Sequence, residues 1–457
     1  MIKKTKDISM VEGPILFKML RFALPIMLTG VLQLLFNAAD LVVVGQFCGS
    51  VSVGAVSATG SITNLIVNLF VGLSVGAGVC VAHGLGSRSS QQVHRTIHTA
   101  IPVALASGVL LTAIGVPLAK PLLEMMDTPQ DVLPLSVMYM RIYFSGITFT
   151  ILYTFASSIL RAAGDTKSPL LYLTIAGGLN VALNLVFVTM FHMNVAGVAL
   201  ATIISQGVSA GLVIRALMRR QDDCHLQLNR LKIHKEQLVK MVRIGLPAGV
   251  QGSLFSISNV IIQSSINSFD SAALVAGNGA ATNIEGFVYT ALNAFSQTAV
   301  NYVGQNAGAM QYQRIRKICR ACLVCVGITG LTLGPLTFLA GPSLLSFYIT
   351  DSAEAIAWGI TRMSYICLFY CLCGLMDVTT GALRGLGSSF VPMVVTVLGV
   401  CVLRILWVYT VFQIPQYHTP DCLYLSYLVS WTLTFLVQLP MLGYILRKRE
   451  RQAAQLA

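Results

Sequence analysis

Apolar residues dominate this chain in long runs that polar residues interrupt at regular intervals. A run of about 20 apolar residues is long enough for a helix to cross a bilayer. The pattern predicts an all-α membrane protein with twelve transmembrane helices. Their expected ranges are 14–45, 51–82, 95–118, 132–157, 168–191, 195–217, 238–268, 272–303, 318–340, 354–380, 390–414 and 422–446.

The second half of the chain repeats the first. Residues 18–25 (KMLRFALP) recur as 240–247 (KMVRIGLP), a shift of 222, and LRAAGDTKSP at 160–169 recurs as LRGLGSSFVP at 383–392, a shift of 223. So constant a shift indicates that a whole domain was duplicated. Two related halves in a membrane protein usually flank a substrate path.

The repeat defines the expected domains. Residues 1–217 form an N-terminal lobe and residues 238–457 a C-terminal lobe, each with six spans, around a central cavity. Because six is an even number, both copies insert with the same orientation, and the lobes are related by an axis along the membrane normal. The polar segment 218–237 joins them, and we expect a surface helix along the cytoplasmic face.

Composition supports a membrane protein and gives its orientation. Hydrophobic residues make up 55% of the chain and charged residues 10%, with a mean hydropathy of +0.75. Of the 30 Lys and Arg, all but Lys120, Arg141, Arg362 and Arg404 fall on one side if the N-terminus is cytoplasmic, which is the positive-inside pattern. Both termini are therefore expected in the cytoplasm, and no cleavable signal peptide is expected.

The net charge of +13 does not indicate nucleic-acid binding, because the basic residues lie in short loops between spans. Anionic lipid headgroups are the better partners. No motif of a hydrolase, metalloprotease or nucleotide-binding enzyme occurs, so an enzyme is not expected. Cys319, Cys322 and Cys325 lie at helical spacing in an apolar run and are expected to be core residues rather than metal ligands.

Function is therefore sought among the polar groups at membrane depth, which are costly there. Asp40 is the one acid well inside a span of the first half. Asn180 and Asn184 share one helical face, and their amide oxygens suit Na⁺ or a protonated carboxyl. Thr202 can supply another oxygen. The alternative for these amides is hydrogen bonding that joins helices.

In the second half, Glu285 and Asp377 lie inside spans, and their counterparts in the first half are Thr63 and Thr154. The halves therefore have different tasks. Arg404 needs an anion, so Glu285 or Asp377 is its expected partner, with a purely structural ion pair as the alternative to a substrate site. Arg141 and Arg362 are expected to extend toward the membrane surface. Pro25 and Pro247 favour bends in the first helix of each half.

The duplicated six-span half, DLVVVG after a proline-containing first span, the paired Asn, VGQNAGA, and LRAAGDT with its twin LRGLG resemble the MATE multidrug and toxin extrusion transporters of bacteria. The resemblance covers nearly the whole chain. It implies an antiporter that exports organic cations or other amphipathic molecules in exchange for H⁺ or Na⁺ by alternating access, without a cofactor, as a monomer in the bacterial cytoplasmic membrane.

The resemblance also assigns residues. Asp40, Asn180, Asn184 and Thr202 fall on the family's cation site, Tyr139 on a tyrosine that lines the nearby cavity, and Pro25 on a proline at which the first helix bends. The second half departs from the pattern. Phe255 and Ser256 occupy the stretch where some members carry a glutamate, and Cys373 takes the place of an aspartate, so a second Na⁺ site of that type is not expected.

Two other functions remain open. One is a flippase for lipid-linked precursors in the same superfamily, which would need several cationic residues in its cavity, and only Arg141, Arg362 and Arg404 are available. The other is a channel or a membrane scaffold without transport. Isolated buried acids on a duplicated scaffold favour alternating access over both.

Overall fold

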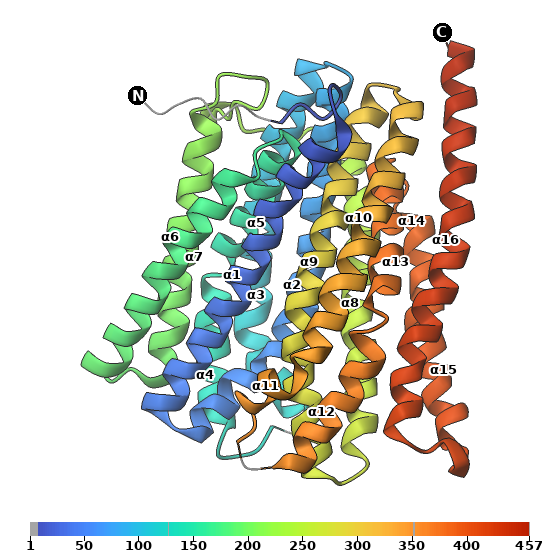
Figure 1. Ribbon diagram of the computed structural model, residues 1–457. Helices are drawn as coiled ribbons and strands as arrows, with labels where there is room; N and C mark the ends of the chain where they lie inside the picture. Colours follow the sequence, from blue (N-terminus) through green and yellow to red (C-terminus); the bar gives the residue numbers. More distant parts are fainter. Residues whose placement is uncertain (1–7, 127, 351, 457) are drawn as a thin grey trace. The chain divides into compact units, whose positions relative to one another are not determined.

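In the computed structural model, residues 8–126, 128–350 and 352–456 are described, and they form helices and connecting loops without a strand (Figure 1). Each expected span corresponds to one helix or to consecutive helices, so the all-α fold is confirmed. The helices are α1 (Ile15–Cys48), α2 (Ser50–Gly86), α3 (Ser90–Glu124), α4 (Leu133–Ser145), α5 (Ile147–Ala162), α6 (Lys167–Leu185), α7 (Asn194–Met218), α8 (Lys235–Asn267), α9 (Ala272–Gly308), α10 (Tyr312–Leu339), α11 (Gly341–Ser346), α12 (Ala353–Ile366), α13 (Tyr370–Gly385), α14 (Phe390–Thr396), α15 (Leu403–Tyr409) and α16 (Pro420–Leu456).

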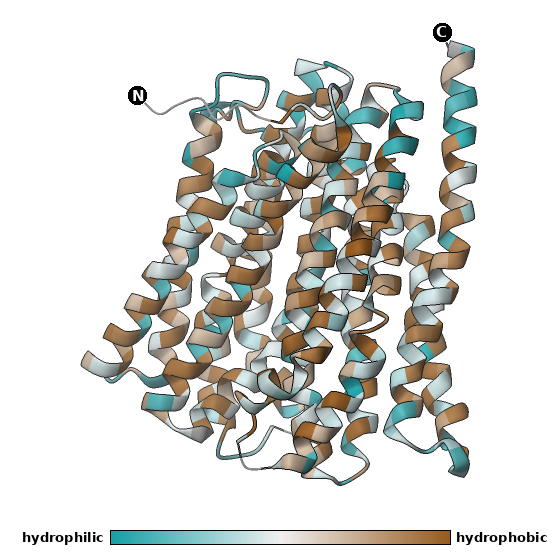
Figure 2. Cartoon of the chain, viewed as in Figure 1, coloured by the Kyte–Doolittle hydropathy of each residue, from teal (hydrophilic) through white to brown (hydrophobic). Residues whose placement is uncertain are grey.

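Within the described residues, nine helices are long and apolar enough to cross a membrane, or up to eleven if each of two bent pairs counts as one span. The expected span that fails this test is α9. This 37-residue helix carries Asn278, Glu285, Asn293, Gln297 and other polar residues, which lower its hydropathy. Figure 2 shows how hydrophobic residues dominate most of the other long helices.

The chain divides into two compact units. Leu28–Gly249 form unit 1 together with Ile8 and Ser9, and Met10–Met27 form unit 2 together with the chain from Val250 onward. The boundaries lie two residues after Pro25 and two residues after Pro247. Each of α1 and α8 therefore belongs to one unit before its proline and to the other unit after it, whereas the sequence predicted whole helices in each lobe.

Unit 1 is organised around α5, which packs against α2, α3 and α7, while α7 also packs against α6 (Figure 1). An apolar core joins the end of α1 to α2 and α7 through Val43, Val44, Ala55 and Val198. A serine begins α3, because the Ser89 side chain accepts a hydrogen bond from the backbone N–H of Gln92 at 3.4 Å.

Two glycine pairs bring the first part of α8 against α2 in unit 1. Gly72 and Gly76 on α2 face Gly245 and Gly249 on α8, and a side chain on any of the four would collide with backbone atoms of the other helix. Both pairs have the GxxxG spacing that lets membrane helices approach closely. The glycines therefore allow the close packing of α2 against α8.

We expect Gly72→Ala to destabilise the protein by about 1–3 kcal/mol, because the added methyl forces α2 and α8 apart. Gly60→Ala on the same helix is the matched control, since nothing lies within 4 Å of that position. It should be neutral or stabilising, because Ala favours a helix over Gly. Thermal unfolding of both purified variants tests the contrast, and equal melting temperatures would contradict it.

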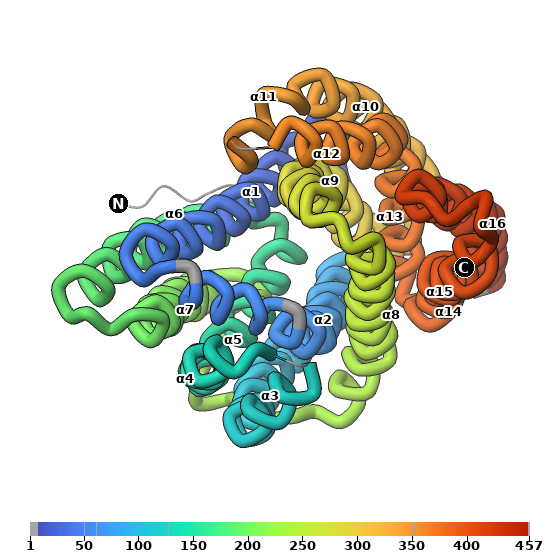
Figure 3. The backbone as a smooth tube through the Cα atoms, turned by 90° about the horizontal axis from the view of Figure 1, so that it is seen from below, coloured from blue at the N-terminus to red at the C-terminus, as the bar shows by residue number. Residues whose placement is uncertain are grey.

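Unit 2 is organised around α9, which packs against α10, α12 and α13. Its core includes Ala281, Ile284, Leu345, Met363 and Cys367. The last helix, α16, packs against α13, α14 and α15, and Figure 3 shows α14, α15 and α16 side by side. Ser271 and Ser352 begin α9 and α12 by accepting backbone hydrogen bonds at 3.2 and 3.1 Å.

The repeated LRxxG motif ends a helix in both units by the same hydrogen bonds. In unit 1, Asp165 N–H donates to the Leu160 carbonyl at 2.9 Å, and Gly164 has φ of 95°. In unit 2, Ser388 N–H donates to the Leu383 carbonyl at 3.0 Å, and Gly387 has φ of 79°. Glycine is needed because the left-handed conformation is costly for residues with a side chain. The duplication is therefore visible in the backbone.

Two expected spans are broken at equivalent places, which the sequence pattern did not predict. α4 and α5 meet at a bend of 48° at Gly146, and α12 and α13 meet at a bend of 48° between Ile366 and Tyr370. At the first break, Ile203 of α7 packs where a Gly146 side chain would lie, so only glycine fits without displacing it. By contrast, α1 and α8 remain helical through Pro25 and Pro247.

The prediction of a surface helix at 218–237 is wrong. Between α7 and α8 the chain is extended and turned, with one 3₁₀ turn at Leu228–Arg230. It is held to α3, because Gln227 N–H donates to His98 Nε2 at 3.1 Å and His234 N–H donates to Thr99 Oγ1 at 3.1 Å. These tertiary hydrogen bonds satisfy backbone groups that a helix would have used itself.

Candidate functional site

A chain of polar side chains connects α1, α6 and α7 in unit 1. Asn184 Nδ2 donates to Asp40 Oδ1, and it lies 3.3 Å from Asn180 Oδ1. Asn180 Nδ2 donates to Thr202 Oγ1, also at 3.3 Å. The four residues that the sequence singled out as an ion-coupling group are thus joined by successive hydrogen bonds.

Local structure explains how these residues meet. Asn180 and Asn184 are one helical turn apart on α6, and both side chains are buried, at 6% and 0% exposed. α6 packs along α7, which brings Thr202 to the first amide. Asp40 lies near the end of α1, where the adjacent Val43 and Val44 belong to the apolar core of unit 1.

Within this group of hydrogen-bonded side chains, one side-chain oxygen lacks a hydrogen-bond donor. Asn184 Oδ1 is buried without a hydrogen bond among the described residues. An unsatisfied buried amide oxygen is costly. A cation beside Asp40 or a proton on its carboxyl would satisfy Asn184 Oδ1, the proton after a rotation of the amide. The geometry therefore leaves a free hydrogen-bond acceptor, Asn184 Oδ1, next to the carboxylate that a bound ion would neutralise.

Tyr139 lies close to the same acid. It is on α4, packs against the Val43–Val198 core, and its hydroxyl interacts electrostatically with Asp40. Its ring stacks on Tyr143 at a centroid distance of 6.4 Å. An aromatic ring with a polar hydroxyl suits the wall of a site that holds an ion in one state and water in another.

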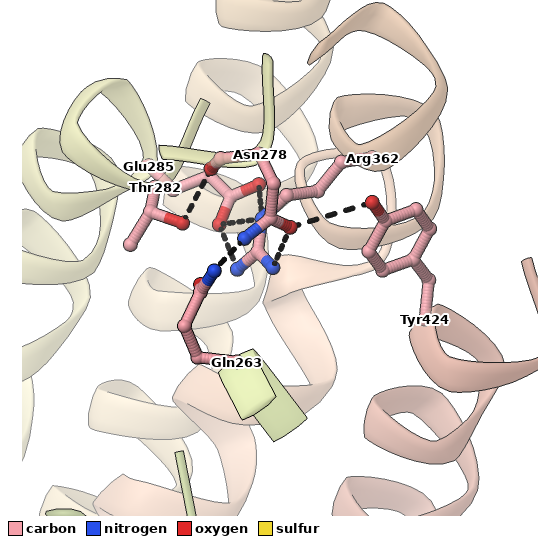
Figure 4. A network of polar contacts seen from close by, with 6 residues as sticks. All are labelled: Gln263, Asn278, Thr282, Glu285, Arg362 and Tyr424. Carbon is pink, nitrogen blue, oxygen red and sulfur yellow. Dashed lines mark hydrogen bonds and ion pairs between the residues drawn. The ribbon is translucent and has the colours of Figure 1, made fainter. Parts of the chain in front are cut away.

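A second network of buried polar groups lies in unit 2 (Figure 4). Arg362 on α12 donates to the Glu285 carboxylate on α9 from Nε and from Nη2, the latter at 2.8 Å. Arg362 Nη1 donates to Asn278 Oδ1 at 2.9 Å, and the same oxygen accepts from the Tyr424 hydroxyl at 3.3 Å. Gln263 Oε1 accepts from Asn278 Nδ2 at 2.8 Å.

This network changes the interpretation of two residues. The expectation that Arg362 extends toward the membrane surface is wrong, because this residue is buried, at 6% exposed, and its charge is neutralised by Glu285. Glu285 is 2% exposed. A two-pronged ion pair between buried partners satisfies both charges inside the unit, so Glu285 presents little free negative charge in this conformation.

Arg404 is also buried, at 1% exposed, but without an acid. The expected ion pair with Glu285 or Asp377 is wrong, because no carboxylate among the described residues pairs with Arg404. Its Nε donates to Ser430 at 3.0 Å, and its guanidinium carbon lies 3.9 Å from the centre of the Tyr427 ring. The aromatic face attracts the cation and replaces part of the missing counter-charge.

Asp377 is the remaining acid of unit 2, on α13, and it is partly exposed. Tyr289 on α9 and Arg384, seven residues further along α13, interact electrostatically with its carboxylate. Ser296 binds only its backbone carbonyl, at 2.7 Å. Asp377 therefore retains more free negative charge than Glu285.

The sequence analysis did not find Asn278, Gln263, Tyr289, Tyr424 or Tyr427. A signal was present for one of them, because Asn278 and Glu285 are seven residues apart and share a face of α9. The tyrosines gave no such signal, since aromatic residues are common throughout apolar helices.

Comparisons with known proteins show the family and the fold of this chain. A family model described as MatE matches residues 25–186 and again residues 247–410. The chain is 27% identical over 393 residues to the probable multidrug resistance protein YpnP of Bacillus subtilis, covering 86% of this chain and 87% of that protein. It is 24% identical to the probable multidrug resistance protein NorM of Thermotoga maritima, covering 85% and 84%.

Among solved structures, an outward-facing multidrug resistance MATE family transporter of the MOP superfamily has a TM-score of 0.91 at 20% identity, covering 98% of this chain and all of the other. At that identity the likeness shows the fold. The family model, which matches each half once and most of the chain in total, shows more: the chain belongs to the MatE family and is a membrane transporter, not an enzyme.

Proposed function

We propose that this transporter is a secondary active antiporter that exports cationic or amphipathic drugs and toxins in exchange for H⁺ or Na⁺ by alternating access. The multidrug resistance proteins that it resembles support export of such compounds. The hydrogen-bonded chain Asp40–Asn184–Asn180–Thr202, with its unpartnered Asn184 oxygen, carries the proposal of ion coupling.

The proposed coupling follows from charge. A carboxylate at membrane depth is costly, so an ion that neutralises Asp40 stabilises the conformation in which the site is dry. A proton would bind the carboxylate directly, whereas Na⁺ would also draw on the oxygens of Asn180, Asn184 and Thr202. In either case the ion must bind one conformation more tightly than the other, because equal affinity shifts no population.

α1 connects this site to the rest of the transporter. Asp40 lies in the part of α1 that belongs to unit 1, and Pro25 lies in unit 2, just before the helix passes into unit 1. A proline removes one backbone hydrogen bond and lowers the cost of bending there. We propose that Pro25, and Pro247 in α8, ease the bends that accompany alternation.

The substrate is proposed to meet unit 2. Of its two acids, Asp377 is the better group for a cation, because Glu285 is held by Arg362. Tyr289 beside Asp377 and Tyr370 beside Tyr289, with ring centroids 6.4 Å apart, offer aromatic faces to the same ligand. Arg404 is covered by Tyr427 and remains a candidate for an anionic part of an amphipathic substrate.

The proposed setting is the bacterial cytoplasmic membrane, with both termini cytoplasmic and the protein acting as a monomer. The flippase alternative has less support, because its cationic cavity would depend on side chains that are otherwise engaged. Arg362 is neutralised by Glu285, and Arg404 is stacked on Tyr427.

Ethidium efflux from proteoliposomes, driven separately by a pH gradient and by a Na⁺ gradient, tests the proposal. We expect one gradient to drive export and its dissipation to stop it. Pro25→Ala should slow export without abolishing it, because the ring eases the bend rather than causing it. Export that depends on neither gradient would contradict antiport, and a complete loss in Pro25→Ala would contradict the modest role of the proline.

A further inference from the structure

A cavity of about 620 Å³ lies in unit 2 between the start of α10 and the last turns of α16. Arg314 and Lys317 line it from α10, and Ala453 and Ala454 line it from α16. Neither the proposed ion site nor the polar network around Glu285 includes any of these residues. The last turns of α16 are largely hydrophilic (Figure 2).

The cavity is positively charged. Its one acidic lining residue, Glu450, is neutralised by an ion pair with Arg316. Arg314 is held in place because its Nη2 donates to the Gly13 carbonyl at 2.9 Å, and Lys317 is exposed and makes no ion pair with any described residue. No side chain caps the N-terminus of α10, so the positive end of a 28-residue helix adds to the same charge.

An apolar surface continues from the cavity along α10. Beyond Lys317 and the exposed Arg320, the same face of the helix presents Val324, Ile328 and Leu331 at steps of three or four residues. Each of these three side chains is about 60% exposed. α10 passes the test for a membrane span, so this face is suited to lipid.

We propose that the cavity between α10 and α16 binds the phosphate headgroup of an anionic phospholipid, whose acyl chains lie along the apolar face of α10. The two parts match the two parts of such a lipid: a basic pocket for the phosphate and a continuous apolar stripe for the chains. A soluble anion would contact the pocket alone, whereas a phospholipid would contact both the pocket and the stripe. Basic groups at the ends of spans attract anionic lipid.

Lys317 and Ala454 are the residues to change. Lys317→Gln removes a charge that no structural contact uses, whereas Arg314 anchors residues 10–13 and is left intact. Ala454→Trp fills the cavity without changing its charge. Lys448→Gln is the matched control, because it removes one exposed positive charge from α16 outside the cavity.

Native mass spectrometry of the full-length protein, titrated with phosphatidylglycerol or phosphatidylcholine, measures the binding. We expect the unmodified protein to retain phosphatidylglycerol preferentially. Lys317→Gln should weaken that binding about fivefold, the effect of one basic residue near an anionic lipid. Ala454→Trp should weaken it at least as much, and Lys448→Gln less than twofold. Unchanged melting temperatures without lipid confirm that the variants are folded.

Three results would overturn the proposal. Equal losses in Lys317→Gln and Lys448→Gln would mean a diffuse basic surface rather than a site. Undiminished binding in Ala454→Trp would place the lipid elsewhere. Displacement of phosphatidylglycerol by millimolar inorganic phosphate would identify a site for a soluble anion. None of these outcomes depends on the coupling ion or on the exported substrate.

Discussion

Asp40→Asn is expected to reduce gradient-driven ethidium export to the level of liposomes without the transporter. The substitution keeps the size of the side chain but removes the group that gains or loses a charge, so the ion gradient has nothing left to bias. The hydrogen-bonded chain through Asn184, Asn180 and Thr202 explains why no neighbour replaces it, since all three are neutral. Transport into proteoliposomes under an imposed gradient is the measurement.

Asp377→Asn is the control for Asp40→Asn, because Asp377 is the partly exposed acid of the other unit. We expect it to weaken the affinity for ethidium while the gradient still drives what export remains. Asp40→Asn should leave ethidium binding measurable. Full drug resistance in cells that carry Asp40→Asn would exclude Asp40 as the coupling group and would move that role to Asp377 or Glu285.

Glu285→Gln is expected to destabilise the protein by about 3–5 kcal/mol, because it leaves the Arg362 guanidinium buried without its counter-charge. Asn278 and the Tyr424 and Tyr427 rings would still contact Arg362, but they carry no charge. Thermal unfolding in detergent measures the loss.

The double variant Glu285→Leu with Arg362→Met separates two explanations. It removes both charges together, and a buried ion pair replaced by apolar residues is often neutral or even stabilising. We therefore expect stability near that of the unmodified protein. If the double variant is stable and still exports ethidium, the pair is structural. If it is stable but inactive, the pair is required for transport.

The helices and the duplication could be predicted because both are visible in the amino-acid sequence without knowledge of tertiary contacts. Apolar runs of the length of a bilayer locate spans, and the recurrence of LRxxG at a constant shift locates equivalent helix ends. The backbone then repeats the same hydrogen bonds at Leu160 and Leu383. The linker was mispredicted because His98 and Thr99, more than a hundred residues earlier, hold its backbone in an extended form.

The hydrogen-bonded group of Asp40, Asn180, Asn184 and Thr202, which stays a proposed ion site, could be grouped from the sequence, and the partners of the arginines could not. The spacing of four residues between Asn180 and Asn184 indicates that both lie on one polar face of a helix. By contrast, Glu285 and Arg362 are 77 residues apart, and their pairing depends on how α9 packs against α12. The second half has two acids, Glu285 and Asp377, and two arginines, Arg362 and Arg404, well within its spans. The sequence alone does not indicate which acid pairs with which arginine.

The passage of α1 and α8 between units has a consequence for biosynthesis. Residues 15–27 emerge first from the ribosome, but the unit into which they pack begins again only at Val250. At roughly 5–20 residues per second, this segment waits on the order of ten to forty-five seconds for its partners.

A chain cut in the linker would suffer from the same arrangement. The first fragment would expose the Gly72 and Gly76 face of α2, since its partner segment 235–249 lies on the second fragment. Two separately made halves would therefore have to exchange helix ends to mature.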